Sequence, residues 1–316
     1  MRWAAIACWL FAGGVAGATL LGQLDRVGLQ GWPGWVFDLF AHWPRQLFIA
    51  AFIVAFAAGS MRLLRPAGVA AAVAALNAAI VLNTGGFALP QPAAPKAKLV
   101  RVVSANVHQS HDALERLAAM ARDYGADVVS IYEAPDDLKD DALAALFPGM
   151  PLRVLPSETP EGLWLFKRSL VVARAGAADQ VGVTHFNDSN GVILRLPYEG
   201  VQMVTSHPPS PGSPHLAFDR NRQLPRIEEG LNTERPFIVM GDLNTTPWGR
   251  IFSAVPGMRA GDPRFEGTFP AVAGPLGLPI DHIKFGGGLS LTDYSVGPDI
   301  GSDHKPLFAT FALPDN

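Results

Sequence analysis

Six short polar motifs in the carboxyl-terminal two-thirds of the chain contain residue types that suit metal-assisted hydrolysis. They are Ser104-Ala105-Asn106, Tyr132-Glu133, His207, Gly241-Asp242-Leu243-Asn244, Ile280-Asp281-His282 and Gly301-Ser302-Asp303-His304. Carboxylate and amide oxygens are ligands that Mg2+ accepts, and a histidine oriented by a carboxylate can relay protons or stabilise charge. Because each motif lies at the end of an expected strand, where loops carry function on a rigid frame, we expect the six to meet in one cleft.

Each motif also has a structural interpretation when it is taken alone. Glu133 fits a solvated carboxylate at a strand end, and Asn106 fits a turn-forming residue. Asp242 and Asn244 fit a turn closed by side-chain hydrogen bonds to the backbone, and Asn244-Thr245-Thr246 also matches a glycosylation sequon. A single histidine is more often packed or simply exposed than catalytic. The presence of all six motifs in order favours the chemical interpretation.

Taken together, the motifs resemble the endonuclease/exonuclease/phosphatase superfamily over about residues 97–313. That superfamily includes deoxyribonuclease-I-like enzymes, abasic-site endonucleases, inositol polyphosphate 5-phosphatases and bacterial sphingomyelinases. The Gly-Asp-Leu-Asn and Ser-Asp-His motifs, with an Asp-His pair between them, are the most specific part of the resemblance. The apolar amino-terminal region makes the chain similar to a membrane-attached bacterial branch.

The resemblance implies a divalent metal site, with Mg2+ as the cofactor and Mn2+ as an alternative ion. Glu133 corresponds to the principal metal ligand with Asn106 beside it, and Asp303 would bind the metal directly or through water. So few protein ligands leave positions for water and substrate phosphate, as Mg2+ requires. His108 and His111 lie close to Asn106 in the sequence, but no role is assigned to them.

The same resemblance assigns the other motif residues to catalysis. Asp242 would orient or deprotonate the attacking water, and Asn244 would hold the phosphate or the water. Asp281 would fix the tautomer of His304, which then contacts the phosphate or relays a proton. His207 would stabilise the phosphate or the leaving oxygen. The implied reaction is in-line attack of water on a phosphoester, first of all a phosphodiester, without a covalent protein intermediate.

Two arginines are weaker candidates for the same site. Arg220 and Arg222 lie on an expected helix after the His207 loop. Either could reach a phosphate, or both could be surface charges. The sequence leaves these alternatives open.

The elements that must position these residues are short apolar runs separated by polar or Gly- and Pro-rich loops. A helix is expected from Asp112, as its cap, to Tyr124, with Gly125 as its stop. Strands are expected at Leu99–Asn106, Asp127–Tyr132, Leu163–Phe166, Val192–Leu196, Val201–Ser206, Phe237–Met240 and Phe308–Phe311. Many strands with few helices predict an α+β fold, a four-layer α/β/β/α sandwich of two packed mixed β-sheets with outer helices.

Three apolar stretches precede this domain and predict transmembrane helices. The expected spans are about 3–24, 46–64 and 67–89, close to the roughly 20 apolar residues that a bilayer requires. Their Ala and Gly content suits close helix packing, and tryptophans between the first two spans suit the headgroup layer. A cleaved signal peptide ending near Ala16-Gly17-Ala18 is one alternative, and buried helices of a soluble domain are another.

The distribution of charge divides the chain in the same way. Residues 1–95 hold five Arg and two Asp, a net +3, whereas residues 96–316 hold 20 Lys or Arg and 26 Asp or Glu, a net −6. A stiff linker with prolines at 90, 92 and 95 lies at the change in composition. We therefore place a transmembrane region at 1–95 and the catalytic domain at 96–316.

The arginines also bear on orientation in the membrane. Arg2 and the Arg62–Arg65 turn are expected on the cytoplasmic side, which places the catalytic domain outside the cytoplasm. Lys96, Lys98 and Arg101 favour the opposite orientation. The interpretation is an integral protein of a bacterial inner membrane with an extracytoplasmic catalytic domain.

The substrate stays open at this level. The net charge of the catalytic domain is unlike the basic surface of a strong nucleic-acid binder, whereas attachment to a bilayer raises the local concentration of lipid headgroups. Nucleic acid and a phospholipid headgroup are therefore both retained as substrate classes, and no obligate protein partner is evident. The alternative function is a catalytically silent membrane-bound binding module on the same fold.

Overall fold

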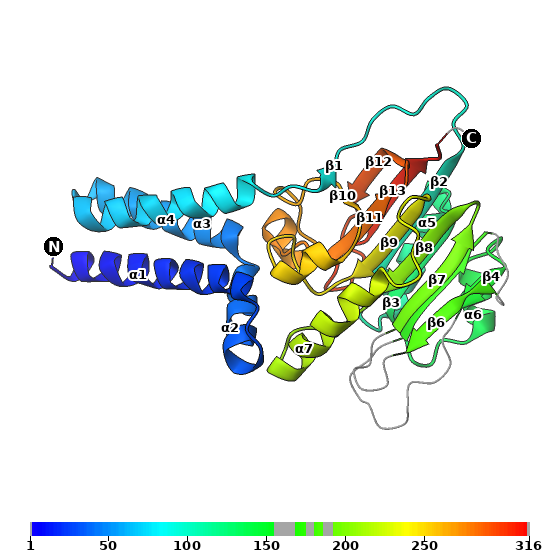
Figure 1. The fold of residues 1–316 in the computed structure, drawn as a ribbon, viewed down its shortest axis with the longest axis horizontal. Coiled ribbons are helices and arrows are strands. Elements are labelled where there is room, and N and C mark those ends of the chain that lie inside the picture. Colours follow the sequence, from blue (N-terminus) through cyan, green and yellow to red (C-terminus); the bar gives the residue numbers. More distant parts are fainter. Residues whose placement is uncertain (1, 155–167, 175–179, 186–191, 315–316) are drawn as a thin grey trace.

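The computed structural model describes residues 2–154, 168–174, 180–185 and 192–314. Two β-sheets, with helices on their outer faces, form the larger body, and four helices extend from it (Figure 1). The strand expected at Leu163–Phe166 lies outside the described residues.

The first sheet has seven strands in the order β1-β10-β11-β9-β8-β7-β6. They are β1 (Phe87–Ala88), β10 (Met258–Ala260), β11 (Asp281–Gly286), β9 (Phe237–Asp242), β8 (Val201–Ser206), β7 (Val192–Tyr198) and β6 (Gly182–His185). Strands β8 and β9 are parallel, and β9 and β11 are antiparallel. The sheet is therefore mixed, as expected.

The second sheet has six strands in the order β12-β13-β2-β3-β5-β4. They are β12 (Ser290–Val296), β13 (Leu307–Ala312), β2 (Leu99–Asn106), β3 (Val128–Ala134), β5 (Arg168–Ala173) and β4 (Leu152–Val154). Strands β2 and β3 are parallel, so their carboxyl ends lie at the same edge. The pair is connected by α5 (His111–Tyr124), which makes the expected strand–helix–strand unit.

The core lies between the two sheets and under the helices on each side. Val100, Met240 and Phe311 belong to the cluster that joins the sheets. Helices α5 and α6 (Asp140–Leu146) cover the six-stranded sheet, and α7 (Pro214–Gln223) and short 3-10 turns cover the other. This arrangement confirms the predicted four-layer α/β/β/α sandwich.

Helix α5 shows how local sequence sets an element. Its apolar face buries Leu114 and Leu117, and Gly125 ends it with a φ of 71°. The cap is Ser110 rather than Asp112, because the Ser110 hydroxyl accepts a hydrogen bond from the Ala113 amide at 3.1 Å. The cap, and with it the start of the helix, therefore lies two residues earlier than predicted.

Four helices form the amino-terminal region: α1 (Arg2–Leu24), α2 (Gly31–Ala41), α3 (Pro44–Ser60) and α4 (Leu64–Leu82). Helices α1, α3 and α4 lie side by side, and α2 crosses their direction at the junction with the domain (Figure 1). Two helices are long and apolar enough to cross a membrane, or three if the bent α2–α3 pair is one span. Ala12, Ala51 and Ala58 are buried where the helices pack, as the small-residue content predicts.

The ends of these elements differ from the expected spans in two respects. Helix α4 ends at Leu82 rather than near residue 89, because β1 follows and pairs in parallel with β10 of the first sheet. Residues 31–41, expected as a connection, form helix α2. The domain boundary at residue 96 remains a prediction, although β1 joins the sheet before that point.

Candidate active site

The polar motifs meet because strand ends from both sheets lie at the same edge of the sandwich. Asn106 ends β2, and Asp242 ends β9 of the other sheet. The Asn106 amide donates a hydrogen bond to the Asp242 carboxylate across the two sheets, at 3.0 Å. Asp281 is the register partner of Asp242, because β11 begins where its antiparallel neighbour β9 ends.

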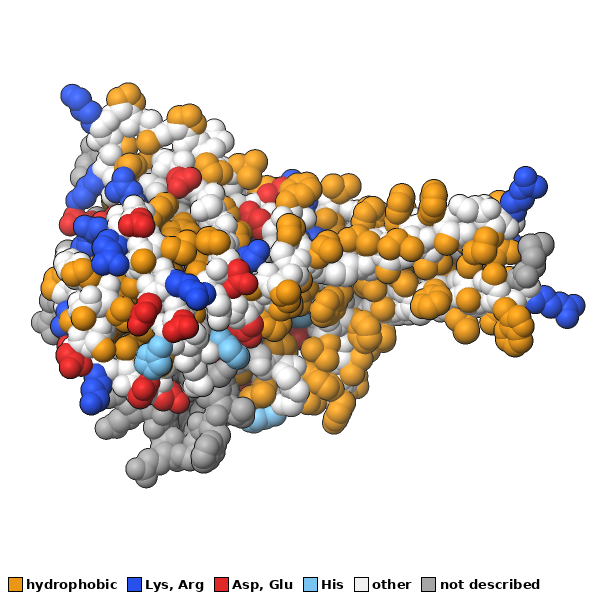
Figure 2. All heavy atoms as spheres, turned by 180° about the vertical axis from the view of Figure 1, so that it is seen from behind, with side chains coloured by type: hydrophobic (Ala, Val, Ile, Leu, Met, Phe, Trp, Pro, Cys, Tyr) orange, Lys and Arg blue, Asp and Glu red, His pale blue; other side chains and the backbone are white. Residues whose placement is uncertain are grey.

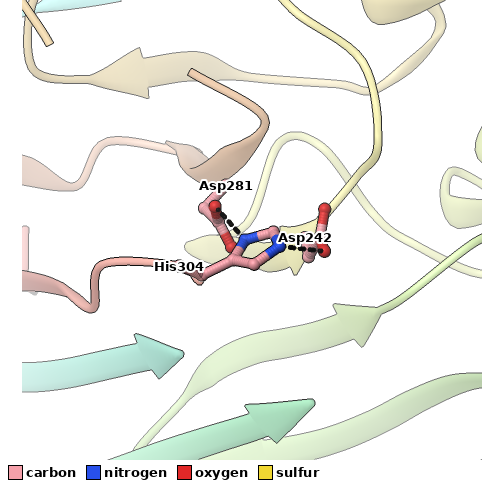
Figure 3. A group of neighbouring side chains, drawn as sticks. All are labelled: Asp242, Asp281 and His304. Atoms are coloured by element: carbon pink, nitrogen blue, oxygen red, sulfur yellow. Dashed lines mark hydrogen bonds and ion pairs between the residues drawn. The ribbon is translucent and has the colours of Figure 1, made fainter. Parts of the chain in front are cut away.

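His304 lies between two buried carboxylates, as Figure 3 shows. Its Nδ1 is 2.9 Å from the Asp281 carboxylate, and its Nε2 is 3.7 Å from the Asp242 carboxylate. Burial alone would lower the pKa of His304, but Asp281 and Asp242 outweigh that effect and raise the pKa to about 10. The imidazole is therefore an imidazolium at neutral pH.

The pKa values of the two carboxylates are shifted in opposite directions. Burial raises the pKa of Asp281. It also acts to raise the pKa of Asp242, but His304 and His207 beside that carboxylate hold its pKa well below the usual range. Asp242 is thus ionised, and the Asp281 carboxylate is hydrogen-bonded to the histidine.

Two further carboxylates lie on the other side of the cavity. Glu133, in β3, and Asp303, before β13, each have a carboxylate oxygen 3.4 Å from the same nitrogen, Nδ1 of His108. A second oxygen of Glu133 is 3.8 Å from His207. Glu133 and Asp303 therefore flank a common, partly exposed space.

The donor set around that space fits a hard divalent cation. Two carboxylates approach the same His108 nitrogen, and Asn106 supplies a nearby amide group, whose oxygen accepts a hydrogen bond from the His108 amide at 2.9 Å. The trio Asp242, Asp281 and His304 also has ligand atoms within 4.8 Å of one another. Because His304 already shares its nitrogens with the two carboxylates of that trio, we favour the Glu133–Asp303 side as the metal site.

Three residues that line the cavity have a backbone conformation that non-glycine residues rarely adopt. Glu133 has a φ of 51°, Asn244 a φ of 49° and His108 a φ of 48°. The Asn244 side chain donates to the Pro208 carbonyl at 3.0 Å, and its backbone amide donates to Asp242 at 3.1 Å. Such strain is tolerated where surrounding contacts fix the backbone, as often occurs at functional sites.

The predicted residues line one cavity of about 420 Å3. Its lining includes Glu133, His207, Asp242, Asn244, Asp303 and His304. Asn106 and Asp281 lie behind it and hold Asp242 and His304. The roles assigned to the eight residues remain proposals, but the structure brings all of them together.

One histidine and the two arginines differ in how they are placed relative to the cavity. His108, left without a role in the sequence, lines the cavity between Glu133 and Asp303. Arg220 does not face the cavity: it is buried and ion-paired with Asp38 of α2 at 2.6 Å, and donates to the Asn244 carbonyl at 2.8 Å. Arg222 lies over the ring of Phe218 on α7.

The sequence also missed a wall of the cavity. Leu39, His42 and Trp43, from α2 and the start of α3, are among the lining residues. His42 is 2.9 Å from the hydroxyl of Thr246, two residues after Asn244. No motif signals this wall, because it depends on how the amino-terminal helices dock against the domain.

A family model of the endonuclease/exonuclease/phosphatase family matches residues 82–304. The match covers more than half of the chain, and the chain therefore belongs to this family, as the motifs predicted. Enzymes of this family generally hydrolyse phosphoester bonds and depend on divalent metals. No curated protein sequence matches the chain significantly.

Solved structures support the fold at low sequence identity. An endonuclease/exonuclease/phosphatase from Beutenbergia cavernae has a TM-score of 0.56 at 18% identity, over 68% of this chain and 72% of that one. An AP endonuclease from Archaeoglobus fulgidus has a TM-score of 0.53 at 13% identity, over 68% and 100%. A family protein from Bacteroides thetaiotaomicron has a TM-score of 0.50 at 16% identity, over 70% and 100%.

Proposed function

We propose that the protein is a membrane-anchored, Mg2+-dependent phosphodiester hydrolase in which a water molecule attacks phosphorus directly. The observation that carries this proposal is the convergence of Glu133 and Asp303 on one side of a cavity and the Asp281–His304–Asp242 group on the other. A binding module without catalytic activity would not require both the Glu133–Asp303 pair and the Asp281–His304–Asp242 group. Mn2+ is the expected substitute for Mg2+.

The proposed role of each residue follows from its charge. Glu133 and Asp303, with Asn106, would hold the cation, which when bound neutralises charge on the phosphate. Asp242, ionised and held by Asn106, orients the attacking water; its low pKa suits orientation better than complete proton removal. The His304 imidazolium, kept in place by Asp281, stabilises the negative charge that develops on the phosphate oxygens.

His207 and Asn244 complete the polar lining. His207 is 3.4 Å from Asp242 and 3.8 Å from Glu133, so it sits between the water-orienting and metal-holding groups. From this position it can donate to a phosphate or leaving oxygen. Asn244 is fixed by Pro208 and Asp242 at the same rim and contacts the phosphate or water.

The helices support an integral membrane protein with its active site outside the cytoplasm. The chain starts at the end of the helical bundle that is far from the domain, and the α3–α4 turn with Arg62 lies at the same end (Figure 1). Figure 2 shows Lys or Arg side chains at that tip and mainly apolar or uncharged atoms along the bundle. Basic residues favour the cytoplasmic side, which supports an extracytoplasmic domain in a bacterial inner membrane.

Hydrolysis of bis-p-nitrophenyl phosphate by the full chain in detergent tests the proposed activity. We expect turnover with Mg2+ or Mn2+ that stops with EDTA. Glu133→Gln and His304→Ala should each reduce kcat/KM by on the order of 100-fold or more, as loss of a charged group in an active site does. Glu199→Gln is a matched control, because Glu199 also has a φ of 51° but lies at an exposed turn.

The control variant should retain wild-type turnover. Metal-independent turnover, or equal loss in Glu199→Gln and Glu133→Gln, would contradict the assignment. Binding of a phosphoester without any turnover would favour the silent module instead.

A further inference from the structure

The side of the catalytic cavity that faces the amino-terminal helices is apolar. Its lining there includes Leu39, Trp43, Phe269, Leu278 and Ile280, with His42 beside Trp43. Leu39 belongs to α2, Trp43 lies between α2 and α3, and the other three belong to the domain segment that precedes β11. A phosphate bound among the polar residues would therefore have hydrocarbon side chains next to it, and the chain region outside the family's fold supplies part of them.

The position of α2 indicates the depth of this cavity in a membrane. Helix α2 is bent by 67° from α3, so if α3 crosses the bilayer, α2 lies close to the membrane plane. Trp32 is 67% exposed and Trp43 is 43% exposed, and tryptophans prefer the headgroup layer. Trp35 anchors α2 to the domain by donating to the Pro211 carbonyl at 2.8 Å. With α3 across the bilayer, the cavity beside α2 would lie at the level of lipid phosphates.

Domain residues next to α3 have the same apolar character. Phe265 is 74% exposed and Leu276 is 59% exposed. Both line a second cavity, of about 430 Å3, with Phe48 and Ile49 of α3. Exposed apolar groups beside a candidate span are stable when lipid covers them. The loop that contributes Phe269 and Leu278 to the catalytic cavity thus lies at the bilayer surface.

The charges at the cavity do not suit a polyanion. Among the described residues that line it there is no Lys or Arg. Nucleic-acid binding depends on Lys and Arg contacts to successive phosphates. A substrate with one phosphate group and a hydrocarbon part matches the lining better.

We propose that the cavity binds a phosphoester of a membrane lipid, with its phosphate at the polar residues and the start of its hydrocarbon chain against Leu39 and Trp43. This inference rests on the proposed hydrolase function and names its substrate class. The water oxygen bonds to phosphorus, the bond from phosphorus to the leaving alcohol oxygen breaks, and one water proton ends on that alcohol. Leu39 and Trp43 are then specificity-determining residues.

Two chromogenic diesters separate the lipid preference from the chemistry. Methyl 4-nitrophenyl phosphate and hexadecyl 4-nitrophenyl phosphate have the same scissile bond and differ only in the length of the alkyl chain. The full chain in dodecyl maltoside micelles should hydrolyse the hexadecyl ester with the higher kcat/KM. An oligothymidylate, offered to the same preparation, should be cleaved poorly.

Variants of Leu39 and Trp43 test whether the preference for the hexadecyl ester depends on these two side chains. Trp43→Ala and Leu39→Ser should lower kcat/KM for the hexadecyl ester about 10-fold, because each removes apolar contact area. For the methyl ester, kcat/KM of both variants should stay within about 2-fold of the wild-type value. Trp9→Ala is the matched control, because Trp9 is on α1, is 46% exposed and is not among the cavity-lining residues. It should leave both rates unchanged.

Photo-crosslinking tests lipid binding even if neither ester is hydrolysed. Hexadecyl phosphate with a diazirine near the phosphate end of its chain should crosslink to the segment 39–43 of the Glu133→Gln variant. Failure of both esters to react would overturn the hydrolase function, while the crosslink would still support a lipid phosphoester site. Crosslinks confined to α1, α3 and α4, equal effects of Trp43→Ala on both esters, or faster cleavage of the oligonucleotide would overturn the lipid proposal.

Discussion

At the scale of single residues, the site depends on how an imidazolium is held between carboxylates. His304 is buried, and Asp281 is its nearest acceptor, at 2.9 Å. The second Asp281 oxygen has no hydrogen-bond partner among the described atoms. In the proposed mechanism Asp281 therefore acts mainly through His304, as the group that orients this histidine.

Asp281→Asn tests this role. The amide keeps the shape but removes the charge that stabilises the imidazolium, so kcat for bis-p-nitrophenyl phosphate should fall by about 100-fold, in the range found for outer-shell partners of active-site histidines. KM should change little. Asp137→Asn is the control, since Asp137 pairs with His111 at 2.8 Å on the surface. Equal losses in the two variants would contradict a specific role for Asp281.

The buried side chain of Lys284 should make the free energy of unfolding depend on pH, independently of the candidate active site. This lysine is buried in β11, where its ammonium group bonds the Val255 carbonyl and lies 4.3 Å from the centre of the Phe252 ring. Burial, followed by the charge of Arg259, lowers its pKa to about 8 from 10.5. The folded state therefore releases the lysine proton at lower pH than the unfolded state.

Lys284→Met makes that difference measurable. Between pH 8 and 10.5 the unfolded chain binds more protons, so the free energy of unfolding of the wild type should rise by about 3 kcal/mol relative to the variant. Below pH 8 the difference between the two proteins should be constant. Denaturant unfolding of both proteins at pH 7 and pH 10 provides the measurement. A constant difference across the whole range would show that Lys284 stays charged.

At the scale of elements, α2 is connected to the catalytic loop by buried polar contacts. Asp38 of α2 pairs with Arg220 of α7, and Arg220 donates to the carbonyl of Asn244. His42 contacts Thr246 in the same loop. The position of the loop that carries Asp242 and Asn244 therefore depends on the docking of the amino-terminal helices.

Removing one partner of the Asp38–Arg220 ion pair should lower the free energy of unfolding. Asp38→Asn leaves a buried guanidinium without its counter-charge, and we expect a loss of roughly 3–5 kcal/mol in unfolding free energy with lower kcat. The double variant Asp38→Leu with Arg220→Met removes both charges and should recover much of the stability. Its kcat should stay low, because the contact to Asn244 is still missing. Full recovery of kcat would show that Arg220 acts on stability alone.

At the scale of the whole molecule, the proposed orientation in the membrane rests on the alternating course of α1, α3 and α4 (Figure 1) and on the basic residues at one end of the bundle. The amino terminus and the α3–α4 turn share one end of the bundle, and the domain occupies the other. Cys8 is the only cysteine, which allows a clean labelling experiment. In a Cys8→Ser background, Met61→Cys reports on the turn and Asp137→Cys on the domain, and both positions are exposed.

An impermeant maleimide should label the Asp137→Cys protein in intact spheroplasts. The Met61→Cys protein should react only after permeabilisation. The reverse pattern would place the active site in the cytoplasm and contradict the positive-inside interpretation. Labelling of both in intact cells would contradict the three-span arrangement.

Much of the fold and of the site was accessible from the sequence because its signals are local. The strands Leu99–Asn106 and Val201–Ser206 have the predicted bounds, since β-branched and apolar runs end at polar residues. Short strands such as β10 and β4 were missed, because three residues carry too little pattern. The family membership was predicted correctly from the ordered motifs, and the two-sheet sandwich from the many short strands with few helices.

The sequence by itself determined the set of chemical groups and their positions at strand ends. Only the tertiary structure decided which groups touch: the β9–β11 register places Asp281 opposite Asp242, and the stacking of two sheets brings Asn106 to Asp242. It also turned Arg220 away from the cavity and placed Leu39 and Trp43 in its wall. Strand ends are set by neighbouring residues, whereas register and helix docking are set by the burial of surfaces far apart in the chain.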